Sequence, residues 1–388
     1  MKKVLFTLYK KRSHSLYKQF INNPPDGYEY FTLDDFFDEF IFEKQSNIFF
    51  EILAKIKRNQ KIIEVARKNK IDIIYCCDGI LLFNSPIPWI LELEHATSLI
   101  AHNFSLWKIA KYILPLILRQ KNLKYLIPWT GAGVRSLEKN LKIKEKVKNK
   151  IRPIHLCLNK VDSFDDIEKR KVRHESFTML FVTSVNYNGE GEFYSKGGRI
   201  VTKVFEKLKK EDGNLKLILR SKIPKEFDYL KNDPRVEIYE DALSNEEFQK
   251  IFLKPDIFFF PGYQSPGLVF LDAMNYNLPI ITTNIFSNSE MVKEGVNGCL
   301  VLFPKSSEIH CLFNKYGIKN VPSGNRAKND LLSEEMIDDF VKKISSLKMD
   351  KKLLMKMGKN SKESLLKEFS LEKRNEGLKN VFDSALNL

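Results

Sequence analysis

The chain contains 388 residues, a length that predicts two ordinary domains at about 150 residues each. Hydrophobic residues make up 43% and charged residues 29%, with 17 Gly and 15 Pro, which excludes a collagen-like, mucin-like or wholly disordered chain. Lys and Arg number 64 against 49 Asp and Glu, so the net charge is +15. That excess favours phosphate-rich or anionic partners without choosing among nucleotides, lipids and nucleic acids.

Cysteine usage and the lengths of the apolar runs indicate the compartment. The five cysteines form no C-x-x-C pair, and their odd number cannot complete a disulfide framework, so we expect a reducing, cytoplasmic environment. The N-terminal apolar run, residues 4–9, is shorter than a signal-peptide core of about 7–15 residues. No run reaches the ~20 uncharged apolar residues of a bilayer-spanning helix, because Lys108, Lys111 and Pro115 interrupt residues 106–118. We therefore expect no transmembrane anchor.

Strand-like apolar runs alternate with helical patterns in the first half of the chain. A helix is expected over residues 49–68, and strands are expected over residues 4–9, 71–77, 89–93, 125–127 and 151–156. This alternation is typical of βαβ units in a parallel, helix-covered sheet. The polar segment 159–175 follows, so the first predicted domain spans residues 1–170.

The alternation restarts after that segment, and the second predicted domain spans residues 171–370. Strands are expected over residues 178–183, 215–219, 236–239, 257–260 and 279–283, and helices are expected over residues 198–209, 245–252 and 267–275. Irregular polar residues at about 305–332 predict a surface insertion without chemistry. Residues 371–388 form an expected terminal helix, whose apolar face predicts that it packs back on the first domain.

An anion site is predicted where the strand ending at Phe260 gives way to a helix. Ser265, Pro266 and Gly267 open that helix, whose first N–H groups lack intrahelical acceptors and whose dipole is positive at this end. Pro266 occupies a position that needs no N–H donor, and Gly267 permits close approach of a ligand. These properties suit a diphosphate. Gln264 and Asp272 flank the helix start and could hold hydroxyl groups, or be a loop residue and a solvated residue without a role.

The residue order over 255–301 resembles the donor-site motif of the family-four retaining glycosyltransferases, which have the GT-B fold. The matching positions are Gly267, Ala273, Met274, Pro279, Thr283, Glu290, Gly295, Asn297 and Gly298. In that family two glutamates hold the transferred sugar and the nucleotide ribose. They correspond here to Gln264, which has no charge, and to Asp272, whose side chain is one methylene shorter. The resemblance implies donor binding by Asn186, Gly197, Arg220, Ser265, Pro266, Gly267, Leu268, Asp272 and Glu290.

Lys196 is the strongest catalytic candidate. Residues 181–198 resemble the first strand of the family's donor domain, its loop and the Lys-Gly pair that begins the next helix. A lysine there suits a β-phosphate whose negative charge grows as the glycosidic bond breaks. The family's loop arginine is absent, and Asn186 or Arg220 are candidates to replace it. Taken alone, the Lys-Gly pair fits a solvated surface lysine equally well.

His95 follows the expected strand 89–93, and ligands of open α/β sheets bind at such carboxyl ends. The resemblance implies that His95 is catalytic and faces the donor sugar; the alternative is a partly buried structural histidine.

Residues 106–118 combine bulky apolar side chains with lysines, as in an interfacial helix, although a buried core helix fits as well. If they share a surface with the basic run 139–152, anionic lipids would attract it by about 1 kcal/mol per basic residue.

We therefore expect an α/β protein of the GT-B fold, with two Rossmann-like, doubly wound domains facing a central cleft. The resemblance implies a retaining, metal-independent hexosyltransferase without a cofactor, which uses a UDP- or GDP-linked donor and a glycan or lipid-linked acceptor in glycan or polysaccharide biosynthesis. The expected location is cytoplasmic or peripheral on an anionic membrane surface. The alternatives are a sugar-nucleotide or glycan binding protein of the same fold with impaired catalysis and, third, a basic nucleic-acid binder, which the absence of a nucleic-acid motif disfavours.

Overall fold

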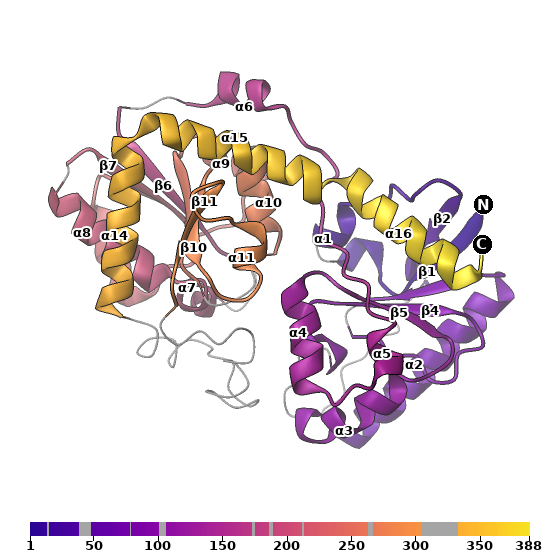
Figure 1. Ribbon diagram of the computed structural model, residues 1–388. Coiled ribbons are helices and arrows are strands. Elements are labelled where there is room, and N and C mark those ends of the chain that lie inside the picture. Colours follow the sequence, from indigo (N-terminus) through magenta and orange to yellow (C-terminus); the bar gives the residue numbers. More distant parts are fainter. Residues whose placement is uncertain are drawn as a thin grey trace. The chain divides into compact units, whose positions relative to one another are not determined.

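A computed structural model of the chain is shown in Figure 1. The structure describes residues 1–388 except 14, 39–47, 78, 101–105, 173–174, 186–188, 212, 263–266 and 304–332. Two compact units divide the chain: unit 1 comprises Met1–Asn159 and Ser370–Leu388, and unit 2 comprises Lys160–Phe369. The surface insertion expected at 305–332 lies outside the described residues.

Unit 1 contains a parallel sheet with the strand order β2-β1-β3-β4-β5 in the part of the chain that the structure describes. Its strands are β1 (Lys2–Phe6), β2 (Tyr28–Phe31), β3 (Ile73–Cys76), β4 (Trp89–Leu93) and β5 (Leu123–Pro128). Its helices are α1 (Ser15–Lys18), α2 (Ile48–Lys68), α3 (Trp107–Ile117), α4 (Gly131–Asn140), α5 (Glu145–Lys148) and α16 (Leu371–Leu386). Every residue of β3 and β4 is buried, as in a sheet covered by helices on both faces.

The prediction of a strand over residues 151–156 is wrong. This segment runs along β5 but forms only the bridge between Leu126 and Ile151. The amide of Arg152 donates to Leu126 O at 2.8 Å, and that of Ile154 donates to Pro128 O at 3.0 Å. A regular ladder would have a third hydrogen bond between these two bonds, donated by the N–H of residue 128. Pro128 has no N–H, so the ladder is interrupted. The sequence pattern also does not predict β2.

Unit 2 contains a second parallel sheet, whose described strands run in the order β11-β10-β9-β6-β7-β8. The strands are β6 (Phe177–Val182), β7 (Leu215–Arg220), β8 (Val236–Tyr239), β9 (Ile257–Phe260), β10 (Ile280–Thr283) and β11 (Gly298–Val301). The helices are α6 (Phe164–Arg170), α7 (Glu190–Ser195), α8 (Gly198–Glu211), α9 (Asn245–Phe252), α10 (Leu268–Asn275), α11 (Asn288–Met291), α14 (Glu334–Met349) and α15 (Lys351–Glu368). Read in chain order, this is the Rossmann arrangement 3-2-1-4-5-6.

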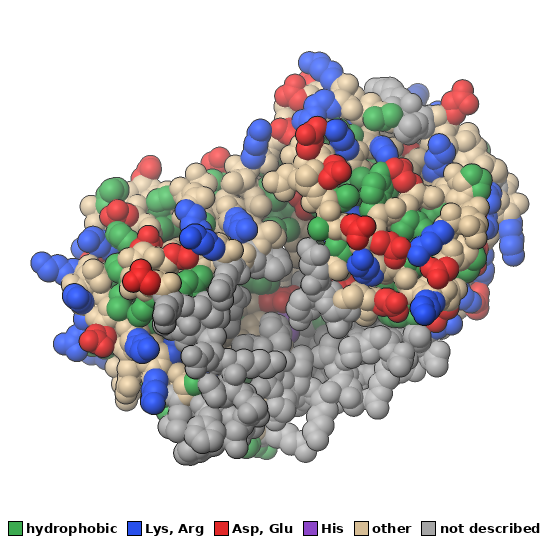
Figure 2. Space-filling model, turned by 180° about the vertical axis from the view of Figure 1, so that it is seen from behind, with side chains coloured by type: hydrophobic (Ala, Val, Ile, Leu, Met, Phe, Trp, Pro, Cys, Tyr) green, Lys and Arg blue, Asp and Glu red, His purple; other side chains and the backbone are tan. Residues whose placement is uncertain are grey.

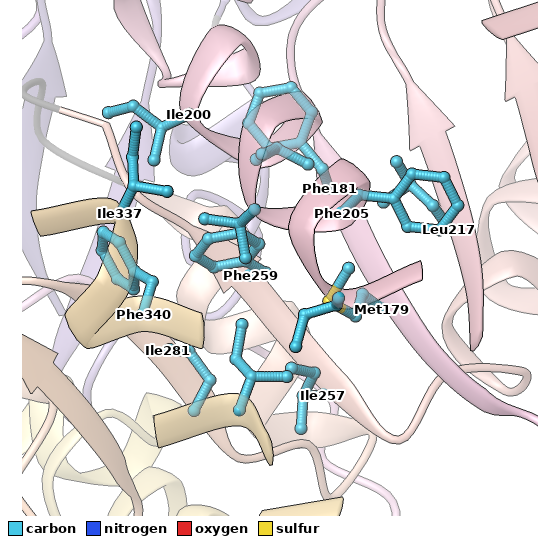
Figure 3. Packing of buried hydrophobic residues seen from close by; sticks show 14 of the residues in the cluster. Met179, Phe181, Ile200, Phe205, Leu217, Ile257, Phe259, Ile281, Ile337 and Phe340 are labelled. Carbon is cyan, nitrogen blue, oxygen red and sulfur yellow. The ribbon is translucent and has the colours of Figure 1, made fainter. Parts of the chain in front are cut away.

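Alternate residues of the unit 2 strands build its core, because successive side chains of a strand point to opposite faces of the sheet. One face carries Met179, Phe181, Leu217 and Phe259 against helices α8 and α14 (Figure 3). The ring of Phe259 lies 5.0 Å from that of Phe340 in α14. The two helix-covered parallel sheets confirm the predicted α/β class.

The boundary between the units lies at Asn159 and Lys160, ahead of the boundary predicted after residue 170. Helix α6 belongs to unit 2 because the side-chain Nδ2 of Asn277 donates to Phe164 O and to Glu168 Oε1, both at 3.0 Å. The polar composition of residues 159–175 is typical of a linker, and these long-range bonds are not visible in it.

Helix α16 completes unit 1 from the far end of the sequence. Its Arg374 forms a buried ion pair with Glu92 of β4 and donates to His155 O at 2.7 Å. The guanidinium also lies 4.1 Å from the ring centre of Phe20. The buried apolar face of α16 consists of Leu378, Val381, Phe382 and Ala385. Across the described helices of both units, none has the length and apolar composition to span a bilayer.

Candidate functional site

The topological switch point of the unit 2 sheet lies between β6 and β9, which are neighbours in the sheet although β7 and β8 separate them in sequence. Ligands of open α/β sheets bind beyond the carboxyl ends of the strands at such a point. The chain that leaves β6 forms α7 and then Lys196 and Gly197, whereas the chain that leaves β9 continues into Pro261 and Gly262. Several predicted donor-site residues therefore lie in these two segments.

Two glycines let the two segments touch through their backbones. A Cβ on Gly197 would lie 2.7 Å from the carbonyl carbon of Pro261, and a Cβ on Gly262 would lie 2.7 Å from the carbonyl oxygen of Lys196. Both separations are too short for a side chain, and Gly197 also has a φ of +91°. Lys196 is therefore held against the exit of β9 by contacts that only glycine permits.

The side chain of Lys196 is partly buried, and its Nζ lies 5.6 Å from the ring centre of Phe260 at the end of β9. Its backbone amide donates to Glu192 O at 2.9 Å, which ends α7. Burial raises the pKa of the Glu192 carboxyl, and the positive charge of Lys196 opposes that rise. This environment differs from that of the solvated surface lysine in the alternative interpretation.

Side chains of β10 fix the exit of β9. The hydroxyl of Thr282 donates to Phe260 O at 2.6 Å, and that of Thr283 donates to Gly262 O at 2.8 Å. The Asn288 amide of α11 donates to Thr282 Oγ1 at 3.0 Å. Sequence reasoning placed Thr283 in a family pattern but missed these bonds, because they depend on the register that sets Thr282 opposite Phe260.

Arg220 ends β7, beside β6. Its Nη1 donates to Thr183 O, whereas its Nε is buried without a hydrogen-bond partner among the described residues. Burial lowers the pKa of the guanidinium, although an arginine stays charged at physiological pH. The guanidinium carbon lies 5.9 Å from the ring centre of Phe248. A desolvated cation on β7, next to β6, whose Nε has no partner among the described residues, fits the predicted anion-binding role.

Helix α10 follows the exit of β9, and its N-terminus carries the predicted anion site. Leu268 is the first helical residue, and Gly267 is the N-cap with a φ of 57°. As a glycine, this N-cap has no side chain to bond the first turn, and among the described residues other than its chain neighbours no heavy atom lies within 4 Å of a Cβ built on it. First-turn N–H groups that no N-cap side chain satisfies suit an anion. Four predicted site residues lie outside the described part of the chain: Asn186, Gln264, Ser265 and Pro266.

The two acidic candidates occupy separate helices. Asp272 lies in α10, where burial raises the pKa of its carboxyl from 3.8 to about 7. No described residue donates a hydrogen bond to that carboxyl group, and it is only partly exposed, unlike the solvated aspartate of the alternative interpretation. Glu290 lies partly buried in α11, and its amide donates to Ser287 O at 3.0 Å.

His95 belongs to unit 1 and follows β4 at its carboxyl end, as predicted. Its Nδ1 lies 2.6 Å from the hydroxyl of Thr97, and its Nε2 lies 3.8 Å from the Glu94 carboxylate. The side chain is 14% exposed. These contacts fix the ring orientation, and they are compatible both with a structural histidine and with a histidine that keeps an edge available to a ligand.

The remaining features of the described residues are their capacity to bind a metal ion and the distribution of their charged side chains over the surface. Among the described residues, no three or more His, Cys, Asp or Glu side chains form a group that could hold a metal ion. Figure 2 shows Lys and Arg side chains spread over the face in view, with acidic side chains between them.

Comparisons with known proteins support the interpretation of unit 2. Residues 179–310 match the family Glycosyl transferases group 1. The matched stretch begins in β6 and contains Lys196, Arg220, Gly262 and Asp272. A curated relative, the "Uncharacterized 41.2 kDa protein in cps region" of Klebsiella pneumoniae, is 26% identical over 110 residues, which are 27% of this chain and 31% of that protein. The matched region thus spans about a third of the relative's length.

Solved structures resemble the whole chain. HepE of Anabaena, in complex with UDP and glucose, has a TM-score of 0.61 at 14% identity, over 99% of this chain and 100% of that chain. WaaG, titled a glycosyltransferase involved in lipopolysaccharide biosynthesis, has a TM-score of 0.61 at 12% identity, over 98% and 99% of the two chains. A glycosyltransferase from Rickettsia africae has a TM-score of 0.60 at 14% identity, over 99% and 98%. Likeness at these identities shows the fold, and the predicted GT-B fold with two Rossmann-like domains is confirmed.

Proposed function

We propose that the protein is a glycosyltransferase that moves a sugar from a UDP- or GDP-linked donor to a hydroxyl group of an acceptor. The observation that carries the proposal is the family match over 179–310, together with a partly buried lysine at the switch point inside that match. HepE, which has the same fold, is titled as a complex with UDP and glucose, and this supports a uridine nucleotide as the first donor to test.

The proposed mechanism is electrostatic stabilisation of the departing diphosphate. Negative charge grows on the β-phosphate as its bond to the anomeric carbon breaks. The ammonium group of Lys196, the guanidinium of Arg220 and the first N–H groups of α10 are positive groups at the carboxyl edge of the sheet. Fixed charges in a partly desolvated place stabilise such a charge more than water does, and no enzyme nucleophile is required.

The remaining site residues take the roles that the family resemblance implies. Gln264 holds hydroxyl groups of the transferred sugar, and Asp272 holds the ribose. Asn186, Gly197 and Glu290 contribute to donor binding, as do the consecutive residues Ser265, Pro266, Gly267 and Leu268. His95 of unit 1 is assigned to catalysis.

We further propose retention of the anomeric configuration without a metal or cofactor, and a glycan or lipid-linked acceptor. The Klebsiella relative is named for a cps region, and WaaG is described as involved in lipopolysaccharide biosynthesis; both names support a role in glycan or polysaccharide biosynthesis. The four described cysteines, Cys76, Cys77, Cys157 and Cys299, are buried and form no disulfide bond with one another, which supports a cytoplasmic location. We expect no nucleic-acid partner.

A second candidate is a sugar-nucleotide or glycan binding protein of this fold that has lost catalysis. It is favoured by the uncharged Gln264, and by the absence of an arginine between Asn186 and Lys196.

The decisive experiment combines nucleotide binding with turnover. A panel of UDP- and GDP-sugars is screened by thermal shift, and donor hydrolysis or transfer is then measured with the stabilising donor. Lys196→Ala should lower kcat by about 10²–10³-fold, as loss of one stabilising group at a developing charge does, without lowering the melting temperature. Lys210→Ala, at an exposed lysine of α8, is the matched control and should change neither.

The results test the role of Lys196 and distinguish the two candidate functions. Undiminished turnover in Lys196→Ala removes that residue from the mechanism. Nucleotide binding by the wild type without any turnover establishes the sugar-nucleotide binding protein. No stabilisation by any nucleotide overturns both the transferase and the sugar-nucleotide binding protein, and leaves the glycan binding protein. Product NMR reads the anomeric configuration, and turnover in EDTA tests independence from metals.

A further inference from the structure

Helix α3 of unit 1 presents apolar side chains on two faces. Trp107, Leu114, Ile117 and Leu118 are buried. Four large apolar residues are exposed instead: Ile109 (63%), Tyr112 (68%), Ile113 (48%) and Leu116 (61%). One face of the helix therefore packs in the core, as the core-helix interpretation of residues 106–118 expects, and the other face meets solvent.

The exposed residues form one continuous stripe. Positions 109, 112, 113 and 116 follow the i, i+3, i+4, i+7 spacing of a single helix face. A helix face that meets water is normally polar, and a contiguous exposed apolar patch marks an interaction surface. We call these four residues the α3 stripe.

Cations lie beside the α3 stripe and at the end of its helix. The Lys111 ammonium is 4.9 Å from the ring centre of Tyr112. Lys150 Nζ donates to Leu118 O at 3.1 Å and to Gln120 O at 2.7 Å, directly after α3. Burial, together with the charges of Lys146 and Lys124, lowers the pKa of Lys150 to about 8. Several lysines therefore gather where α3 ends.

The sequence around α3 is also rich in basic residues and poor in acidic ones. Residues 106–152 contain 13 Lys and Arg but only two acidic residues, Glu138 and Glu145, so this segment supplies eleven of the chain's +15 charges. The partner of this surface must therefore combine apolar and anionic character.

We propose that the α3 stripe and its lysines form a docking surface for an anionic lipid bilayer, with α3 lying in the plane of the interface. The stripe enters the boundary of the acyl chains, and the lysines meet the phosphate groups. Two copies of this chain are a poorer occupant, because a twofold contact through the stripe would bring two lysine clusters together. The inference does not depend on the proposed transfer activity.

Flotation of the full chain with vesicles tests this surface. The wild type should bind vesicles of phosphatidylcholine with phosphatidylglycerol, bind pure phosphatidylcholine at least about tenfold more weakly, and lose affinity as salt rises. Ile113→Asn/Leu116→Asn should reduce binding to the anionic vesicles by about tenfold or more, since two exposed apolar groups no longer enter the interface. Lys121 is exposed in the segment between α3 and β5, and Lys124 is one of the cations beside Lys150. Lys121→Glu/Lys124→Glu should reduce this binding by at least about fivefold per lysine.

Matched controls distinguish binding through the α3 stripe and its lysines from binding through the overall positive charge of the protein. Met355→Asn and Lys352→Glu change an exposed apolar residue and an exposed lysine of α15 in unit 2, and should leave vesicle binding unchanged. Circular dichroism melts should show that all variants remain folded. Absence of binding by the wild type, or equal binding by the stripe variant and the wild type, overturns the proposal. Concentration-dependent dimerisation without lipid that Ile113→Asn/Leu116→Asn abolishes would assign the stripe to a second copy instead.

Discussion

Lys196 and Asp272 each derive their chemistry from the atoms around them. Lys196 lies over the ring of Phe260 and beside the buried carboxyl of Glu192, so its ammonium is partly shielded from water. A charge in such a place acts more strongly on a nearby phosphate than a surface charge does. Asp272 has no charged partner among the described residues, and burial shifts its pKa.

The raised pKa of Asp272 predicts a pH-dependent stability. Between 3.8 and about 7 the folded state holds a proton that the unfolded state has released, so stability contributed by this group falls as pH rises through that window. The free energy of unfolding of the wild type, minus that of Asp272→Asn, should decrease from pH 4 to about 7 and stay constant above it. Urea unfolding at a series of pH values measures this difference.

The control is Asp241→Asn, since Asp241 has a side chain that is 95% exposed. The difference between the wild type and this variant should not follow the same curve. A pH-independent difference for Asp272→Asn would show that the carboxyl is solvated in the folded protein.

At the scale of elements, the glycines after α7 and β9 determine how two loops meet. The sequence shows Lys-Gly and Pro-Gly as separate turn signals, and the strand order β9-β6 makes them neighbours. The hydroxyl groups of β10 then hold the β9 exit in place. The position of Lys196 is thus a property of three strands and one helix together.

Gly262→Ala should disturb the backbone contact between Gly262, after β9, and Lys196, after α7. Its new Cβ would lie 2.7 Å from Lys196 O and 2.8 Å from Lys196 Cα, so one segment must move. We expect a loss of about 1–3 kcal/mol in stability, as for other overpacked sites, and weaker nucleotide binding because Lys196 is displaced. Chemical denaturation and nucleotide titration measure the two effects.

Gly213→Ala provides the comparison, because no heavy atom of the described residues, chain neighbours aside, lies within 4 Å of the corresponding Cβ. It should cost far less stability and leave nucleotide binding intact. Equal behaviour of the two variants would mean that the close approach at Gly262 has no consequence.

At the scale of the whole molecule, the chain builds unit 1 from both of its ends. Residues 370–388 join that unit after the chain has completed unit 2. The buried pair of Arg374 and Glu92 connects α16 to β4, and both side chains are at most 1% exposed. Removing one partner leaves an uncompensated buried charge, which costs far more than losing a surface ion pair.

Arg374→Met should therefore destabilise unit 1 by about 3–5 kcal/mol in denaturant unfolding. The double variant Glu92→Leu/Arg374→Met removes both charges and should recover much of that loss. Lys373→Met, which removes an exposed partner of Glu376 in the same helix, should cost less than about 1 kcal/mol. A double variant that is as unstable as the single one would indicate that packing of the guanidinium on Phe20, and not the charge, carries the effect.

Local patterns of the sequence were sufficient for most elements and for the fold class. Buried strands such as β4 and β9 lie where the apolar runs predict them, because burial on both faces of a parallel sheet requires continuous apolar residues. The segment 151–156 has apolar residues at 151, 154 and 156 but fails as a strand, since its pairing depends on Pro128 of another segment.

The residue types of the site are likewise present in the sequence: a Lys-Gly pair, a Pro-Gly turn, an arginine at a strand end and an aspartate in the next helix. Only the tertiary structure decided that Lys196 touches the exit of β9, that no described residue accepts from Arg220 Nε, and that one side of α3 remains exposed. These properties arise from contacts between segments far apart in the chain, and the spacing of residues along one segment does not specify them.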